Sequence, residues 1–192
     1  MTTATHTLSR TVDTAAVPSA GRWDIDPAHT SAEFVGRHLM VTKVRGSFQN
    51  VSGSIVVADD PLESEVEVVI DASSLSTGAA DRDGHLKSAD FFDVENYPEI
   101  RFMSTSVSPN GSSWKLEGDL TIKDVTKSVV LDFDFVGLVD DPWGNSKAAF
   151  SASTEILRED WGLNWNVALE SGGLLVSKKI VIEIEVQASP AS

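Results

Sequence analysis

The chain has 192 residues, a formal net charge of -14 and no cysteine. This length suits one large domain with a substantial core, and no apolar run is long enough to form a membrane-spanning helix. The acidic charge argues against nucleic acid and anionic membrane surfaces as partners, and the lack of thiols excludes disulfide scaffolds, thiolate metal sites and cysteine nucleophiles.

The chain begins with a polar segment, residues 1–22, that is rich in Thr, Ser and Ala and has no aromatic side chain. This composition predicts a disordered N-terminal tail before a single domain that covers residues 23–192. A secretory signal needs a basic start followed by an apolar run, and neither occurs here. We therefore expect a cytoplasmic protein.

From Trp23 onward the apolar residues alternate with polar ones. In residues 114–122, for example, Trp114, Leu116 and Leu120 alternate with charged and hydroxyl side chains. Such a period of two predicts strands with one buried and one solvated face. About eight strands are expected on this basis: 32–38, 44–58, 66–70, 100–107, 114–122, 129–135, 150–156 and 180–186.

The strands are separated by short turn sequences rather than by helices, which predicts an antiparallel sheet. One segment, residues 73–98, has no alternation and is expected to be a long excursion with one or two helical turns. Long antiparallel strands with one apolar face can close into a barrel or pack as a sandwich, and the period of two fits both. In a barrel, the apolar set of each strand would face the interior, which places Leu116, Phe133, Phe150 and Ile182 there, and Phe34 and His38 on the inner side of 32–38.

No residue pattern in the chain specifies a reaction. There is no nucleophile elbow, phosphate-binding loop or dinucleotide fingerprint, so no cofactor is expected. The three histidines outside the tail, His29, His38 and His85, lack metal-ligand spacing, so no metal site is expected. The charged groups around Arg82 and Arg158 are interpreted as surface or loop-pinning ion pairs, and 26–29 as a structural turn.

Large rings lie between the predicted strands at two places. Phe91 and Phe92 end the irregular segment, and Trp161 and Trp165 belong to a second one. Rings in such positions either line the entrance to a cavity and move as a gate, or plug the end of the barrel permanently. Both interpretations are open, and the gate hypothesis makes all four residues ligand contacts.

Several longer motifs resemble the YceI-like family over residues 23–188. They include WDIDPAHTSAEF at 23–34, VRGSF at 44–48, RDGHLKSADFF at 82–92, GDLTIK at 118–123 and REDWG at 158–162. The resemblance implies an elongated, lipocalin-like barrel of eight antiparallel strands around a hydrophobic pore. It also implies a polyisoprenoid or another long-chain lipid as the ligand, and a homodimer.

Three functions are therefore considered. The first is non-enzymatic binding or carriage of a long-chain lipid, with Arg37, His38 and Arg45 at one mouth of the pore as candidates to hold its head group. The alternative is a hydrolase or isomerase acting on a lipid-like substrate, with His38 or His85 as general base. The third is a structural or stress-response β module whose barrel is simply full.

Overall fold

The structure of the protein, a computed structural model, describes residues 9–12, 15–142, 144–170 and 173–191. The strands are β1 (Ser9–Val12), β2 (Ala15–Pro18), β3 (Gly21–Ile25), β4 (Ser31–His38), β5 (Thr42–Phe48), β6 (Val51–Val57), β7 (Glu65–Asp71), β8 (Leu75–Ser76), β9 (Glu99–Asn110), β10 (Ser113–Ile122), β11 (Val125–Asp140), β12 (Ser146–Leu157) and β13 (Lys179–Pro190). The helical elements are α1 (Ala80–Lys87) and the 3-10 turns η1 (Pro27–His29), η2 (Pro61–Glu63), η3 (Ala72–Ser74) and η4 (Arg158–Trp161). No helix in the described ranges is long and apolar enough to cross a membrane.

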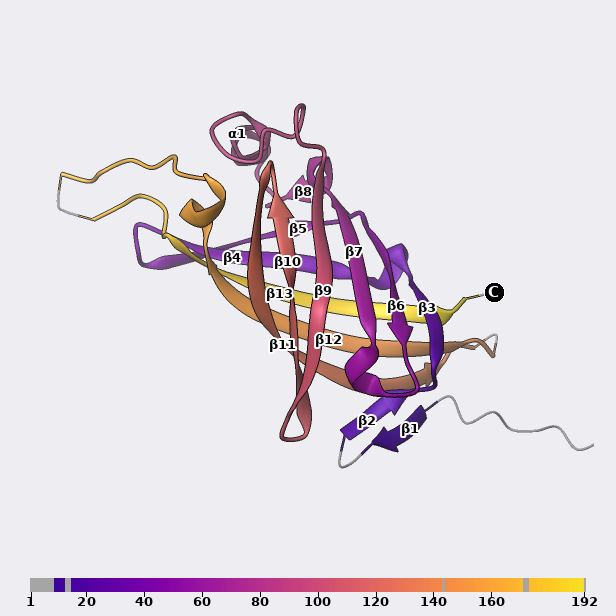
Figure 1. Cartoon of the computed structure of the whole chain (residues 1–192). Helices are drawn as coiled ribbons and strands as arrows, with labels where there is room; N and C mark the ends of the chain where they lie inside the picture. The colour runs from indigo at the N-terminus through magenta and orange to yellow at the C-terminus, as the bar shows by residue number, and fades with distance from the viewer. Residues whose placement is uncertain (1–8, 13–14, 143, 171–172, 192) are drawn as a thin grey trace, which may run out of the picture.

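Hydrogen bonding closes the sheet into an antiparallel barrel (Figure 1). The strand order around the barrel is β12, β11, β10, β9, β7, β6, β3 and β13, and β12 pairs with β13 to complete it. β4 continues β3 after η1, and β5 leads into β6, so each of these pairs acts as one long, bent strand of the wall. The predicted eight-stranded antiparallel barrel with a short helical excursion is thus confirmed, and the sandwich alternative is wrong.

The alternation of the sequence corresponds to the inner and outer faces of the wall. On β10, Leu116 and Leu120 are buried inside while Glu117 and Asp119 are exposed outside. Gly118 also faces inward, and a Cβ atom there would lie 2.4 Å from the Phe102 ring. Glycine at this position therefore makes room for a ring that projects into the barrel from β9.

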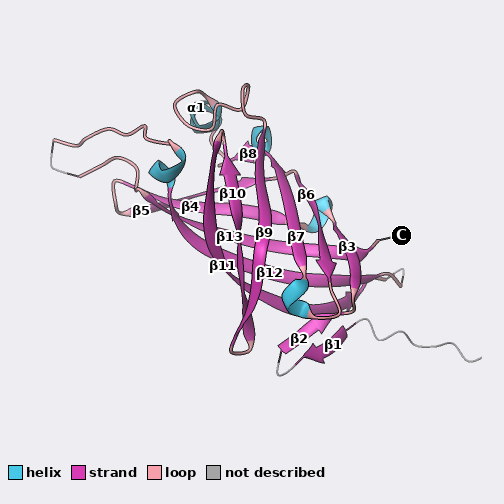
Figure 2. Cartoon of the chain, in the orientation of Figure 1, coloured by secondary structure: helices cyan, strands magenta, loops and turns pink. Residues whose placement is uncertain are grey.

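The direction of β12 and β13 distinguishes the two ends of the barrel. The far end is where β12 begins and β13 finishes, and the mouth end is where β12 finishes and β13 begins. α1 and the long connection between η4 and β13 lie at the mouth end, and the β1–β2 hairpin lies at the opposite one (Figure 1). Helical elements are confined to strand connections, as Figure 2 shows.

The segment before Trp23 differs from the predicted disordered tail. It contains the β1–β2 hairpin, and Gly21 already belongs to β3. Val17 of β2 is buried against Trp114 at the start of β10. A single valine packed on a distant tryptophan leaves no periodic signal, which is why composition alone misses it. Residues 1–8 and 13–14 of the predicted tail lie outside the described residues.

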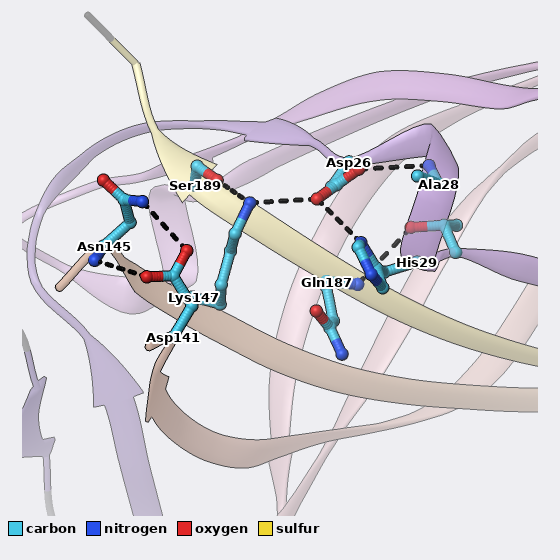
Figure 3. A network of polar contacts seen from close by, with 9 residues as sticks. Asp26, Ala28, His29, Asp141, Asn145, Lys147, Gln187 and Ser189 are labelled. Atoms are coloured by element: carbon cyan, nitrogen blue, oxygen red, sulfur yellow. Dashed lines mark hydrogen bonds and ion pairs between the residues drawn. The ribbon is translucent and has the colours of Figure 1, made fainter. Parts of the chain in front are cut away.

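A polar network stands at the far end of the barrel (Figure 3). The Asp26 carboxylate accepts hydrogen bonds from Lys147 Nζ at 2.9 Å and from the Ala28 amide at 3.0 Å, and it pairs with His29 Nδ1 at 3.1 Å. The Lys147 hydrogen bond is the main cause that lowers the pKa of Asp26 to about 2. Lys147 also donates to Ser189 Oγ. Residues 26–29 thus form the structural turn that the sequence predicts, and they tie η1 to β12 and β13.

The irregular segment 73–98 is held at the mouth end by its own polar contacts. Asp83 Oδ1 of α1 accepts hydrogen bonds from the Thr77 amide at 2.8 Å and from Thr77 Oγ1 at 2.5 Å. These bonds lower the pKa of the Asp83 carboxyl, with the Thr77 hydroxyl as the largest cause. Arg82 Nε donates to Thr77 Oγ1 at 2.7 Å. The charged residues at 82 and 83 therefore pin the loop through hydrogen bonds to Thr77, and not through the predicted ion pairs.

Candidate functional site

The barrel encloses a cavity of about 530 Å³ that is walled by the inner faces of the strands. It extends from Phe150 and Val186, nearer the far end, to α1 and the connection that follows η4. Nine of the predicted ligand contacts line it: Phe34, His38, Phe91, Phe92, Leu116, Phe133, Phe150, Trp165 and Ile182. That these residues bind a ligand stays a prediction, but the structure brings them to one cavity.

Several apolar side chains on the inner face are only half-buried although they point into the barrel. Phe34, Phe133 and Ile182 belong to this group. Side chains from opposite walls would cover one another in a filled barrel. The interior is therefore not packed to the density of an ordinary core, which argues against a module whose barrel is simply full.

A cluster of rings covers the mouth end. The rings of His85 and Trp165 meet edge to face with centroids 4.5 Å apart, and the Phe91 ring lies 5.2 Å from His85 and 5.5 Å from Trp165. We call His85, Phe91, Trp165 and Arg158 the mouth cluster, since the Arg158 guanidinium lies 5.9 Å from the centre of the Phe91 ring. All four residues line the cavity. The cluster joins the 73–98 segment to the connection after η4, the two segments that both the gate and the plug interpretation concern.

Trp161 does not take part in this cluster, and the structure places it outside the cavity lining. The residue is 3% exposed, and it is absent from the cavity lining. Its indole Nε1 donates to the Leu120 carbonyl at 3.0 Å. Trp161 ends the 3-10 turn η4, which turns its side chain into the core beside β10. Trp161 is thus packed into the core, while Trp165 faces the cavity.

The three residues predicted to hold a head group do not all lie at the cavity. His38 and Arg37 line the cavity near the turn between β4 and β5, and both side chains are exposed. Arg45 is not part of the cavity lining. Its guanidinium pairs with Glu183 at 2.7 Å and with Glu33 at 3.5 Å on the outer surface, and the Glu183 hydrogen bond is the main cause that raises its pKa.

The two cavity histidines have different surroundings. His85 Nε2 lies 2.9 Å from Asp90 Oδ2. His38 forms an isolated bridge with Val176 through its backbone, and no hydrogen bond or ion pair of its ring occurs among the described residues. A search of the described ranges finds no group of His, Cys, Asp and Glu side chains that could hold a metal ion.

Arg158 lies at the cavity, where the sequence does not predict it. The sequence predicts a surface or loop-pinning ion pair for this residue, yet it is 4% exposed and lines the cavity. Burial lowers its pKa. A signal was present in the sequence, because Arg158 continues the inward-facing set of β12, in which Phe150, Ala152 and Ile156 are separated by even steps.

The comparisons with known proteins decide the family. The model of the YceI-like domain matches residues 23–188. The chain belongs to the YceI-like family. A UPF0312 protein of Photorhabdus laumondii is 38% identical over 157 residues, which cover 80% of this chain and 82% of the relative. A UPF0312 protein of Staphylococcus aureus is 38% identical over 169 residues, covering 85% of this chain and 95% of the relative.

Three solved structures share the fold. The Campylobacter jejuni YCEI protein is 29% identical, with a TM-score of 0.68, and the match covers 81% of this chain and 90% of that one. Burkholderia cenocepacia BcnA is 20% identical with a TM-score of 0.72, covering 86% and 100%. A polyisoprenoid binding domain from Saccharophagus degradans, implicated in plant cell wall breakdown, is 16% identical with a TM-score of 0.65, covering 88% and 98%.

Proposed function

We propose that this protein binds a polyisoprenoid or another long-chain lipid inside its barrel and carries it without changing it chemically. The observation that carries the proposal is the cavity of about 530 Å³, which is walled mainly by aliphatic and aromatic side chains. Its volume falls within the range of roughly 300 to 1,000 Å³ that is common for small-molecule sites.

The driving force for such a ligand follows from the lining. Each methylene group moved from water into an apolar site contributes about 0.8 kcal/mol, and a long chain offers many of them. Affinity therefore needs no reactive group. The likeness to the polyisoprenoid binding domain of Saccharophagus degradans supports the same class of ligand.

The test compares an inner and an outer position of one strand. Phe133 lines the cavity from β11, whereas Val130 of the same strand is 48% exposed on the outer face. We expect Phe133→Asp to weaken binding of the isoprenoid alcohol farnesol at least roughly tenfold, because an unpaired carboxylate next to an apolar chain loses its hydration. Val130→Asp should leave affinity unchanged, as measured by calorimetric titration.

A second variant avoids placing a charge in the wall. Ala152 lines the cavity, and its neighbour Ser153 is exposed outside, so Ala152→Trp should fill the cavity while Ser153→Trp should not. Equal loss of farnesol binding in the inner and outer variants, or full binding by both inner variants, would place the ligand outside the barrel. Mass spectrometry of an organic extract of the protein from its native cells would then identify the chain that it carries.

The enzymatic alternative rests on the His85–Asp90 pair, whose atoms lie 2.9 Å apart at the cavity mouth. A carboxylate that orients an imidazole is the arrangement of a general base. His85 is also held edge to face by Phe91 and Trp165, which gives it a packing role. A carrier with His85→Ala or His38→Ala should still bind farnesol with altered affinity, whereas an enzyme would lose nearly all turnover of a lipid ester.

A further inference from the structure

One buried cation at the cavity mouth has incomplete hydrogen bonding. Arg158 Nε donates to the Ser177 carbonyl at 3.0 Å, and Nη1 donates to the Leu163 carbonyl. Nη2 is fully buried and has no hydrogen-bond partner in the described part of the chain. The two satisfied nitrogens hold the guanidinium in a fixed orientation, with the third nitrogen left to donate.

The charge of Arg158 also lacks an ion-pair partner at contact distance among the described residues. No ion pair within the described ranges includes it, and the adjacent Glu159 is engaged with Lys178 Nζ at 3.0 Å. The face of the Phe91 ring gives partial compensation at 5.9 Å. A buried charge without an opposite partner is costly, and an unmet guanidinium donor adds to that cost.

The position of Arg158 determines what could supply the missing partner. The side chain is 4% exposed, so bulk solvent is closed off from it, but it lines the cavity beside Phe91 and Trp165. A partner for Nη2 would therefore come from the cavity contents. Two more arginines of the lining, Arg37 and Arg82, lie at the same mouth.

The balance of basic and acidic residues in the cavity lining differs from that of the whole protein. The chain has 15 basic and 29 acidic residues, yet the lining includes four arginines and two carboxylates, Glu33 and Asp81. Arg101, one of the four, pairs with Glu99 outside the wall, and Glu33 pairs with Arg45. An acidic protein with cations around one apolar cavity is suited to a ligand with an apolar chain and a negative end.

We propose that Arg158 is the head-group anchor of the cavity, and that its Nη2 donates to an anionic oxygen, of a carboxylate or a phosphate, at the end of a long-chain ligand. The inference rests on the proposed function, since it assigns a head-group class to the same cavity. The hydrocarbon chain would then lie along the inner face of β12, from Ile156 toward Phe150.

The experiment uses three probes that share one isoprenoid chain: farnesol, farnesoic acid and farnesyl phosphate. Each is titrated into the wild type, Arg158→Gln, Arg158→Lys and Arg45→Gln by calorimetry. We expect the wild type to bind the acid or the phosphate roughly 10- to 100-fold more tightly than the alcohol, the range of a charge-assisted hydrogen bond. The two anionic probes identify which head group fits.

The variants separate recognition from structure. Arg158→Gln should lose the preference for the anion, so that its affinities for farnesol and for the two anionic probes agree within roughly threefold. Arg158→Lys, which keeps the charge without the guanidinium fork, should keep part of that preference. Arg45→Gln removes an arginine that lies outside the cavity, so its preference should equal that of wild type.

Two results would overturn the inference. Equal affinity of the wild type for all three probes would mean that Nη2 is satisfied by water, and an unchanged preference in Arg158→Gln would place the anion elsewhere. Both leave the proposed function intact, since the chain is still bound. Binding of none of the probes would overturn the proposed function itself. If Arg158→Gln does not fold, the wild-type ranking together with Arg158→Lys decides.

Discussion

The two ends of the barrel are covered in different ways. At the far end, Asp26, Lys147 and Ser189 satisfy one another, and the β1–β2 hairpin packs over Trp114. At the mouth end, the rings of His85, Phe91 and Trp165 line the cavity, and Arg158 keeps one donor unpaired. The far end is built for stability. At the mouth end a buried hydrogen-bond donor has no protein partner among the residues that the structure describes, which is typical of a ligand-binding site rather than of a packed core.

The largest expected difference concerns one tryptophan from each end. Trp23 is 1% exposed and its Nε1 donates to the Ser19 carbonyl, whereas Trp165 is half-buried at the cavity mouth. Trp23→Ala should lower the free energy of unfolding by about 3 to 5 kcal/mol because it leaves a large void. Trp165→Ala should cost clearly less while it weakens farnesol binding. Urea unfolding checks the first statement, and equal losses for the two variants would erase the distinction between the ends.

The hairpin provides a second way to test the far end. Deleting residues 1–18, which keeps the Ser19 carbonyl that accepts from Trp23, should lower the free energy of unfolding by about 2 kcal/mol, because burial of Val17 on Trp114 is lost. The single change Val17→Asp in the full chain should have a similar effect and serves as the control. A deletion that leaves the melting temperature unchanged would show that the hairpin contributes nothing, as a disordered tail would.

The third comparison lies within the mouth end, between Trp161 and Trp165. Trp161→Phe should cost about 1 to 2 kcal/mol, because the Leu120 carbonyl loses its indole donor inside the protein. Farnesol affinity should not change, since Trp161 is outside the cavity lining. Trp165→Phe should weaken farnesol binding and should change the free energy of unfolding little. Denaturation and titration of both variants distinguish a plug from a cavity residue.

The smallest effect is expected from acid at the far end. Because the folded-state pKa of Asp26 is lowered from 3.8 to about 2, its stabilisation is fully present above the unfolded value and is lost as the pH falls through the folded one. We expect about 1 kcal/mol after allowance for partial solvent screening. Asp26→Asn should remove this acid dependence between those two pH values. Lys147→Met is the matched control, and a wild-type slope retained in both variants would assign the dependence to other carboxylates.

The sequence was most informative where the chain forms regular strands. Alternation along β10 to β13 predicts their inner faces, because a closed wall presents successive side chains to opposite sides. It thereby placed Leu116, Phe133, Phe150 and Ile182 at the cavity. Two of the predicted site residues lie outside the cavity lining, for different reasons. Trp161 lies in a 3-10 turn, where the period of two does not apply. Arg45 lies on β5 with the outward parity, opposite to Val44, and Glu183 holds it there from a strand that is distant in sequence.

The remaining errors concern partners that no local pattern specifies. Val17 is buried because Trp114 lies opposite, and Arg158 is unpaired because the nearest acid is engaged with Lys178. Burial and charge compensation are properties of the whole fold, so they become visible only with the three-dimensional arrangement. The even spacing from Phe150 to Arg158 is nevertheless present in the sequence. Extended one residue past the end of β12, it places Arg158 on the inner face of the barrel.

The last strand of the barrel, β13, has a further consequence for how the protein is made. β13 pairs with β12 on one side and with β3 and β4, from the opposite end of the sequence, on the other. Both seams therefore depend on the strand that is made after all the other strands of the barrel, and pairings between such distant segments form slowly. Until β13 is in place the other strands are an open sheet with an apolar face and unpaired edges, a state that is prone to aggregation. An enclosed compartment for a lipid exists only after β13 has been made.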